Sequence, residues 1–236
     1  MNSNQLHQPS SGSRQQAYMY LNDQGIGHLA RHDTQAALAC FTRALTIVQQ
    51  GVATAPVANE GSIQSPVWLS VSIQGLSDDE SGLYIHCEAL SLQIGTDGSD
   101  SVQTHSMAAV AILFNLALTY HVHGVKHQKM ARIQKASRLY ELCSGEMMSS
   151  PHVDPTLCLF VSMACLNNKA QIQYQYLGSK ANAAELACQL QQQLEPVLTA
   201  VDNEGNLLSH TYSQLDEMFL NAQMLSHAVC MGASAA

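Results

Sequence analysis

The chain has 236 residues, of which 46% are hydrophobic, so it is long enough to bury a substantial core without disulfides or metals. Charged residues make up only 12% of it, and the formal net charge is −8. A negative charge opposes binding to nucleic acid, which requires a basic surface, and we therefore expect no nucleic-acid partner.

The cysteines indicate a reducing compartment. There are seven of them, without any Cys-x-x-Cys pair, and most lie among Ala and Leu in helical patterns, where a thiol packs as a small apolar group. The polar N-terminus lacks a signal-peptide pattern, and the most apolar run is interrupted by Asn115 and Thr119. We therefore expect a cytoplasmic or nuclear protein without a membrane span.

Residues 1–16 are predicted to be a disordered tail, and residues 17–236 to be a single helical domain with a non-helical insertion. Two helices are expected between residues 17 and 50, because apolar residues recur there at steps of three and four. The turn between them is placed at residues 31–34, where Asp33 and Thr34 are good N-cap residues for the second helix.

Residues 51–105 interrupt the helical pattern with Gly and Pro, and they contain acids but no Lys or Arg. Two segments, 67–74 and 83–94, have the length and the apolar pattern of strands, and turn residues separate them. They predict a β hairpin that docks on the helices, because an isolated hairpin is marginally stable in water. A flexible insertion is the alternative. Residues 217–225 favour equally a third strand or a short terminal helix.

Four further helices are expected, at about residues 106–123, 126–148, 157–177 and 181–201. Short polar breaks join them in two antiparallel pairs, which makes about three pairs with the first two helices. The expected fold class is therefore mainly α, built from antiparallel helix pairs with a small β hairpin as an appendage.

The three helix pairs resemble the tetratricopeptide repeat. In the first pair, the signature positions are occupied by Leu21, Gly25, His28, Ala37, Phe41 and Ala44. In the second pair, which contains about two helical turns more than the motif allows, they are occupied by Asn115, Leu116, Ala117, Tyr120, Ala136, Tyr140 and Cys143. The third pair lacks the aromatic anchor but keeps Asn168, Ala170, Gly178, Ala184 and Cys188. The resemblance covers roughly half of the chain and implies a stack of repeats that binds proteins.

In such a stack, side chains beside the packing positions of the first helices face a concave surface. The resemblance implies that partner-binding residues of this surface are Met19, Asn22, Ile26, Phe114, Leu118, His121, Asn167, Gln171 and Tyr174. The family's best-known groove holds a C-terminal carboxylate with Lys and Arg, which these positions lack. A ligand is therefore expected to bind through apolar contacts and amide hydrogen bonds. Phe114→Ser is predicted to weaken binding and to leave the melting temperature nearly unchanged.

His121, His123 and His127 form the densest group of metal-ligand residues, and the last two have the four-residue spacing of a helical metal pair. No Asp, Glu or Cys lies within several residues of them, and Lys126 and Lys129 add repulsive charge. A polar turn is therefore the preferred interpretation, and a metal-binding protein or enzyme that uses these histidines is the alternative.

Half of the ten basic residues lie within one predicted helix. They are Lys126, Lys129, Arg132, Lys135 and Arg138. Because steps of three rotate around a helix, these cations do not form a single face. They predict either a solvated surface or a docking surface for acids, which belong to a partner or to the acid-only segments of this chain.

No phosphate-binding loop, paired-carboxylate motif or nucleophile motif is present in the sequence. The function expected from these observations is a non-enzymatic protein–protein interaction scaffold. It is expected to bind a protein or peptide in the concave groove and to need no cofactor and no membrane. Self-assembly through the β segment is a further alternative.

Overall fold

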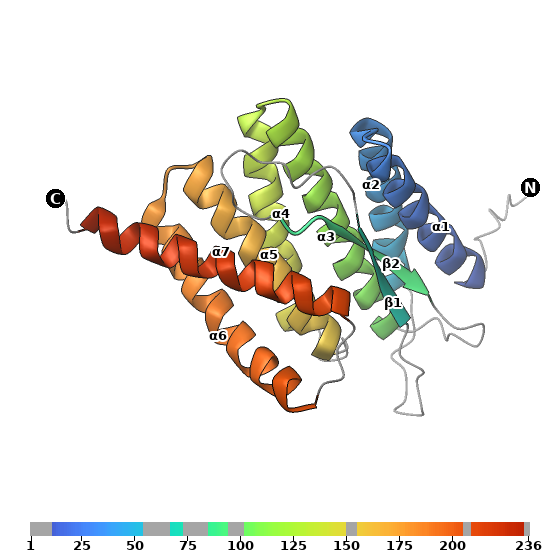
Figure 1. The fold of residues 1–236 in the computed structure, drawn as a ribbon. Helices are drawn as coiled ribbons and strands as arrows, with labels where there is room; N and C mark the ends of the chain where they lie inside the picture. The colour runs from blue at the N-terminus through green and yellow to red at the C-terminus, as the bar shows by residue number, and fades with distance from the viewer. Residues whose placement is uncertain are drawn as a thin grey trace, which may run out of the picture.

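The computed structural model describes residues 11–53, 67–72, 85–93, 102–149, 155–204 and 209–233, and in these ranges the chain is mainly helical (Figure 1). The described elements, in chain order, are α1 (Ser11–Ala30), α2 (Thr34–Val52), β1 (Val67–Ser72), β2 (Glu88–Gln93), α3 (Val102–Lys126), α4 (Met130–Ser149), α5 (Pro155–Gln175), α6 (Lys180–Glu204) and α7 (Ser209–Ala233).

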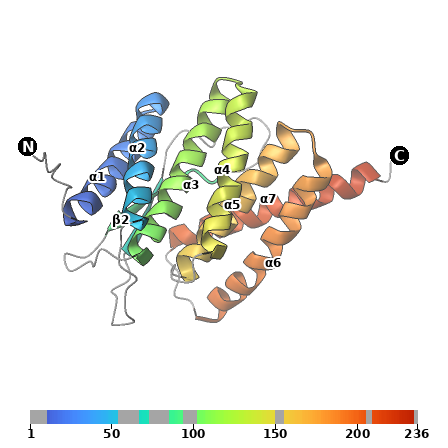
Figure 2. The same ribbon diagram turned by 180° about the vertical axis from the view of Figure 1, so that it is seen from behind.

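The first six helices form three antiparallel pairs, α1 with α2, α3 with α4 and α5 with α6 (Figures 1 and 2). The pairs follow one another in chain order, because α2 packs on α3 and α4 packs on α5. The predicted cap is also present, since Asp33 accepts a hydrogen bond from the backbone N–H of Ala36 at 3.1 Å. The predicted fold class, antiparallel helix pairs with a small β hairpin, is confirmed.

Several predicted boundaries are wrong: α3 runs from Val102 to Lys126 instead of 106–123, and β2 begins at Glu88 instead of residue 83. Helix α1 begins at Ser11, so the predicted tail is helical from residue 11 onward, and residues 1–10 lie outside the described part of the chain. Gln15 in this first part of α1 is buried, which shows that packing outweighs the polar composition there. Helix α4 begins at Met130, because Lys129 closes the preceding turn by donating to the carbonyl of Gly124 at 2.8 Å.

Glycines allow the helices of a pair to cross closely at two points, of which Gly25 is one of the repeat-like signature positions. A Cβ atom added to Gly25 of α1 would lie 2.6 Å from Cε1 of Phe41 on α2. At Gly124 of α3, an added Cβ would lie 2.6 Å from Cγ1 of Ile133 on α4. Each glycine therefore makes room for one buried side chain of the partner helix.

The predicted hairpin is present. Strand β1 pairs with β2 in an antiparallel register that runs from Val67 opposite Gln93 to Ser72 opposite Glu88. Strand β2 lies on α1 and α3, on the side of the helix pairs that faces the viewer in Figure 1. The described part of the insertion is thus docked on the helices, which is the first of the two predicted alternatives, a docked hairpin or a flexible insertion.

The last helix, α7, decides between the two alternatives that the sequence left equally open for residues 217–225: they are helical and do not form a third strand. Helix α7 spans 25 residues, and its buried residues recur at steps of three and four: Leu215, Met218, Ala222 and Leu225. It crosses α5 and α6 on the same side of the molecule as the hairpin (Figure 1). The rear view shows the helix pairs without this cover (Figure 2).

Helix α3 is the central helix of the core. By length and composition alone it could cross a membrane, contrary to the sequence prediction that no segment could. However, 89% of its most apolar window is buried inside the protein, which is typical of the core helix of a helical domain. Asn115 and Thr119 in its middle are fully buried, so protein groups surround them.

Candidate functional site

The residues predicted to line an open concave surface are buried. Asn22, Phe114, Leu118, His121, Asn167 and Gln171 have no exposed area, and Ile26 is 5% exposed. Only Met19 and Tyr174 are partly buried. The prediction of an open groove is therefore wrong, although the first helices α1, α3 and α5 do carry these residues on one side.

Two parts of the chain fill this concave surface. We call residues 85–93, which include β2, the groove segment, and we call the surface of α1, α3 and α5 beneath it the groove. The groove segment packs on α1 and α3, and α7 packs on α5 (Figure 1). Residues 85–90 are all buried, so the chain itself occupies the place that the sequence predicted for a partner.

Asn115 of α3 binds the backbone of Leu90 in the groove segment. Its Oδ1 atom accepts from the N–H of Leu90 at 2.7 Å, and its Nδ2 atom donates to the carbonyl of Leu90 at 2.8 Å. The Nδ2 atom of Asn22 on α1 donates to the same carbonyl at 2.9 Å. Two first helices thus bind the backbone N–H and C=O of one residue of the groove segment through side-chain amides.

Asn168 of α5 binds the backbone of His86 in the same way. Its Oδ1 atom accepts from the N–H of His86 at 2.8 Å, and its Nδ2 atom donates to the carbonyl of His86 at 3.0 Å. The Nδ2 atom also lies 3.0 Å from the hydroxyl of Tyr140. A side-chain amide can both donate and accept, which is what an unpaired strand edge requires.

A chain of amides connects this second contact to α7. The Nδ2 atom of Asn221 on α7 donates to Oδ1 of Asn167 at 2.8 Å, and Asn167 donates to Oδ1 of Asn168 at 3.1 Å. All three side chains are buried. Because buried amides are costly when unpaired, this network fixes α7 against α5 and orients Asn168 toward the groove segment.

Asn115 and Asn168 occupy packing positions of the repeat-like pattern, and their contact with the backbone of the groove segment was not predicted. A signal was present, because asparagine is unfavourable inside a helix and costly among apolar residues unless it is hydrogen-bonded. Asn115 lies in the middle of the most apolar helix of the chain. The sequence alone did not indicate that its partner would be an internal segment.

The side chain of His86 in the groove segment contacts two aromatic rings. The ring of His86 is fully buried, with its centroid 5.2 Å from that of Phe160 and 6.0 Å from that of Phe114. Burial lowers the pKa of His86 from 6.5 to about 4, against the opposing effect of the nearby Glu88 charge. The imidazole is therefore neutral at pH 7.

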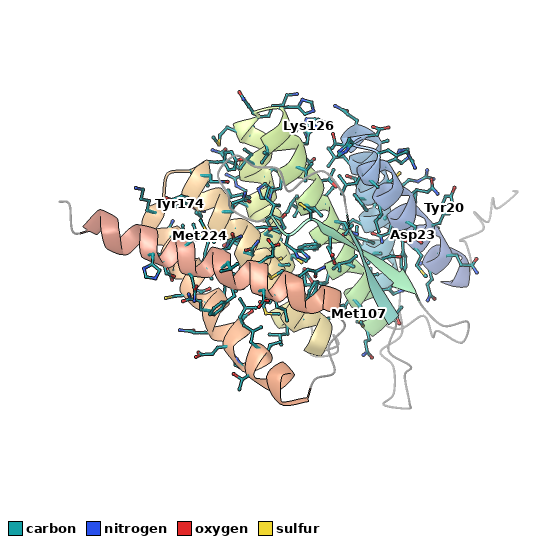
Figure 3. All side chains as sticks on the ribbon, viewed as in Figure 1. Tyr20, Asp23, Met107, Lys126, Tyr174 and Met224 are labelled. Carbon is teal, nitrogen blue, oxygen red and sulfur yellow. The ribbon has the colours of Figure 1, made fainter. Side chains whose placement is uncertain are left out.

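Glu88 and Ser91 mark two further contacts. The Oε1 atom of Glu88 accepts a hydrogen bond from Nε2 of Gln214 on α7, and both residues are buried. The hydroxyl of Ser91 donates to Oδ1 of Asp23 at 2.8 Å, and Asp23 lies on the exposed face of α1 beside the hairpin (Figure 3). The groove segment is thus bound along its length, with one end near solvent.

Of the three histidines, His123 and His127 lie together with their ring centroids 4.5 Å apart, and His121 has a different partner. His121 lies beneath Tyr140, with Nδ1 3.5 Å from the hydroxyl, whereas Nδ1 of His123 lies 2.7 Å from Oγ1 of Thr34. Among the described residues, no group of three or more His, Cys, Asp or Glu side chains is arranged to hold a metal ion. Burial and nearby cations lower the pKa of His123.

The buried thiols are poor nucleophiles. Burial raises the pKa of Cys87 to about 12, and a hydrogen bond with Cys165 together with burial raises that of Cys143 well above the usual value. Since the thiolate is the reactive form, neither cysteine is activated at neutral pH.

Contrary to the sequence prediction, the five basic residues between positions 126 and 138 do not lie on one helix: Lys126 ends α3, Lys129 lies in the turn before α4, and Arg132, Lys135 and Arg138 lie on α4. None of Lys126, Lys129, Arg132, Lys135 and Arg138 forms an ion pair with an acid among the described residues. Instead, Arg132 and Lys135 lie against the ring of Tyr120, and Nζ of Lys135 donates to its hydroxyl at 2.8 Å. Lys126 is exposed at the end of α3 (Figure 3).

The chain matches no protein-family model, and searches of the curated proteins and of the solved structures gave no match. The assignment to a tetratricopeptide-like family therefore stays a prediction from the sequence.

Proposed function

We propose that the protein is a non-enzymatic interaction protein whose groove binds an extended segment of a partner protein in place of its own groove segment. One observation carries the proposal: Asn115 and Asn168 each donate to and accept from the backbone of a single residue of a bound segment. Contacts to the backbone do not depend on the side chain, so they suit a second polypeptide equally well.

The geometry resembles the addition of a strand to a sheet. The N–H of Leu90 donates to Asn115, so this edge of β2 faces the helices, whereas the opposite edge pairs with β1. The asparagines thus take the place of a neighbouring strand. An incoming segment has its own N–H and C=O groups at the same two-residue period and meets the same acceptors and donors.

The internal segment sets the affinity that a partner needs. A tethered segment has an effective concentration on the order of millimolar, so a partner binds in competition with it. The apparent dissociation constant rises in inverse proportion to the fraction of molecules with an open groove. Weakening the internal segment should therefore strengthen binding of an added one.

A synthetic peptide with the sequence of residues 83–94, LYIHCEALSLQI, provides the probe. We propose to label it with a fluorophore, keep it reduced, and measure its binding to the full chain by fluorescence anisotropy. Leu90→Ala in the protein removes a fully buried side chain of the groove segment, which weakens internal docking by about 2–5 kcal/mol and leaves the groove unchanged. We expect this variant to bind the peptide at least tenfold more tightly than the wild type.

Asn115→Ala in the same Leu90→Ala background should abolish binding, because it removes one of the two backbone contacts. Asn182→Ala is the matched control, since Asn182 is exposed on α6. Circular dichroism verifies that each variant is folded. If Leu90→Ala unfolds the chain, Ser91→Ala removes only the bond to Asp23 and is the milder substitute. A folded Leu90→Ala protein that does not bind the peptide contradicts the proposal, as does a folded Leu90→Ala, Asn115→Ala protein that binds it as tightly as Leu90→Ala alone.

A further inference from the structure

We infer that the groove selects partner segments with a neutral ring at one position, an acid two residues later, and alanine and leucine at the next two positions. The inference rests on the proposed function and names the chemistry of its ligand. It is drawn from the side-chain surroundings of His86, Glu88, Ala89 and Leu90. These surroundings can distinguish one sequence from another, whereas the backbone contacts bind any sequence.

The ring position is formed by two aromatic side chains from different helices. Phe114 of α3 and Phe160 of α5 both contact the His86 ring, and the Phe160 contact is edge-to-face, with an interplanar angle of 77°. Edge-to-face contact is favourable for aromatic rings in general. Phenylalanine or neutral histidine therefore suits this position, whereas lysine would place a charge among apolar rings.

The acid position lies against α7. Gln214 is buried and donates to the carboxylate of Glu88 from its Nε2 atom. A hydrogen bond to a charged group is stronger than one between neutral groups, so this contact favours an acid over an apolar residue. A lysine at the same position would direct one donor against another.

The last two positions accept apolar side chains of limited size. Ala89 and Leu90 have no exposed area. A buried alanine leaves no room for a larger side chain without displacement of its neighbours. One residue further on, Ser91 reaches Asp23 near solvent, and a Ser-to-Ala change there should affect binding less than the buried positions do.

A panel of peptides tests this inference in the Leu90→Ala protein by the same anisotropy measurement. The parent is LYIHCEALSLQI, and the variants replace His86 by Phe, Ala or Lys, Glu88 by Lys, and Ala89 by Leu. We expect His86→Phe to bind within about threefold of the parent. His86→Ala, His86→Lys, Glu88→Lys and Ala89→Leu should each bind at least tenfold more weakly. A scrambled peptide sets the background.

A charge exchange makes the test reciprocal. Gln214→Glu in the protein should shift the preference from the parent peptide toward the Glu88→Lys peptide, because the new carboxylate repels an acid and pairs with an amine, and the ratio of the two affinities does not depend on how far the internal segment is displaced. Gln223→Glu places the same charge on the exposed face of α7 and should change neither affinity. If Gln214→Glu shifts the preference toward the Glu88→Lys peptide and Gln223→Glu does not, the result supports the contact between Gln214 and Glu88.

The outcomes separate the two proposals. If the parent and all single-residue variants bind with equal affinity, the backbone contacts act alone; the proposed function holds and the inferred selectivity is wrong. If the parent peptide does not bind a folded Leu90→Ala protein, the proposed function itself is contradicted. If light scattering shows that Leu90→Ala forms dimers that Asn115→Ala abolishes, the ligand is a second copy of this chain, which overturns the assignment to another protein.

Discussion

The side chain of Asn115 donates to Oδ1 of Asn22 at 2.9 Å, and both amides also donate to one carbonyl oxygen, that of Leu90. The two asparagines are 93 residues apart in sequence. This arrangement joins α1, α3 and β2 at a single buried point, so the docking of the hairpin and the packing of the first two helix pairs depend on each other.

Asn115→Ala should lower the free energy of unfolding by about 1–3 kcal/mol, because it leaves the buried N–H of Leu90 without its acceptor. Urea denaturation followed by circular dichroism measures the effect. Asn182→Ala, at an exposed helical position, should change stability by less than about 0.5 kcal/mol. Equal effects of the two substitutions would show that the Asn115 contacts contribute nothing.

Phe114→Ala should destabilise the protein by about 3–5 kcal/mol, since Phe114 has no exposed area and contacts Tyr140 and His86. The sequence prediction that Phe114→Ser spares the melting temperature assumed an open groove, which the groove segment fills. Leu142→Ala is the control, because Leu142 is 58% exposed. A melting temperature for Phe114→Ala equal to that of the control would restore the original prediction.

The parts of the fold that follow from local patterns were predictable. The cap at Asp33, the close crossing at Gly25 and the strands of the hairpin each depend on residues near in sequence or on a periodic pattern. Residues 217–225 fitted a strand and a helix equally well, and the recurrence of buried residues at helical steps from Leu215 to Leu225 is the signal that favours the helix.

The occupied groove was not predictable from one sequence. Asn168 and His86 are 82 residues apart, and no local pattern specifies that their amide and backbone groups meet. A buried asparagine indicates only that a partner exists. The same positions thus fit an external peptide or an internal segment, and tertiary packing decides between them.

Gly25→Ala and Gly145→Ala should have opposite effects, although both replace a glycine inside a helix. At Gly25 the new methyl group meets the ring of Phe41, so we expect a loss of about 1–3 kcal/mol. At Gly145 nothing lies within 4 Å, and the gain in helix propensity should stabilise the protein by about 0.5–1 kcal/mol. Differential scanning calorimetry measures both, and a stabilising Gly25→Ala would refute the close crossing.

Stability should decrease as the pH falls from 6.5 toward 4. The pKa of His86 is about 4 in the folded chain, so between these values the unfolded chain binds the proton and the folded chain does not. The contribution is fully present above pH 6.5 and amounts to about 3 kcal/mol. His86→Phe removes this dependence, whereas His227→Phe, at an exposed position of α7, should retain it. Identical pH profiles for His86→Phe and the wild type would contradict the assignment.

Lys126→Glu with Lys129→Glu should leave stability unchanged within about 0.5 kcal/mol at low salt, because both side chains are exposed and neither pairs with an acid among the described residues. Lys135→Glu should instead destabilise the chain by about 0.5–1 kcal/mol, since Lys135 contacts the ring and the hydroxyl of Tyr120.

The same variants test whether the basic residues at the turn between α3 and α4 bind an acidic partner. A fluorescent peptide of ten glutamates is the probe, and binding to the wild type should weaken as salt rises, because the screening length is about 10 Å at 0.1 M ionic strength. The Lys126→Glu, Lys129→Glu variant should lose this binding, whereas Lys180→Glu, which changes one exposed cation at the start of α6, should retain most of it. If the wild type does not bind the peptide at low salt, these basic residues form a solvated surface. A large loss of stability in the double variant would indicate instead that these lysines contact acidic segments of the chain itself.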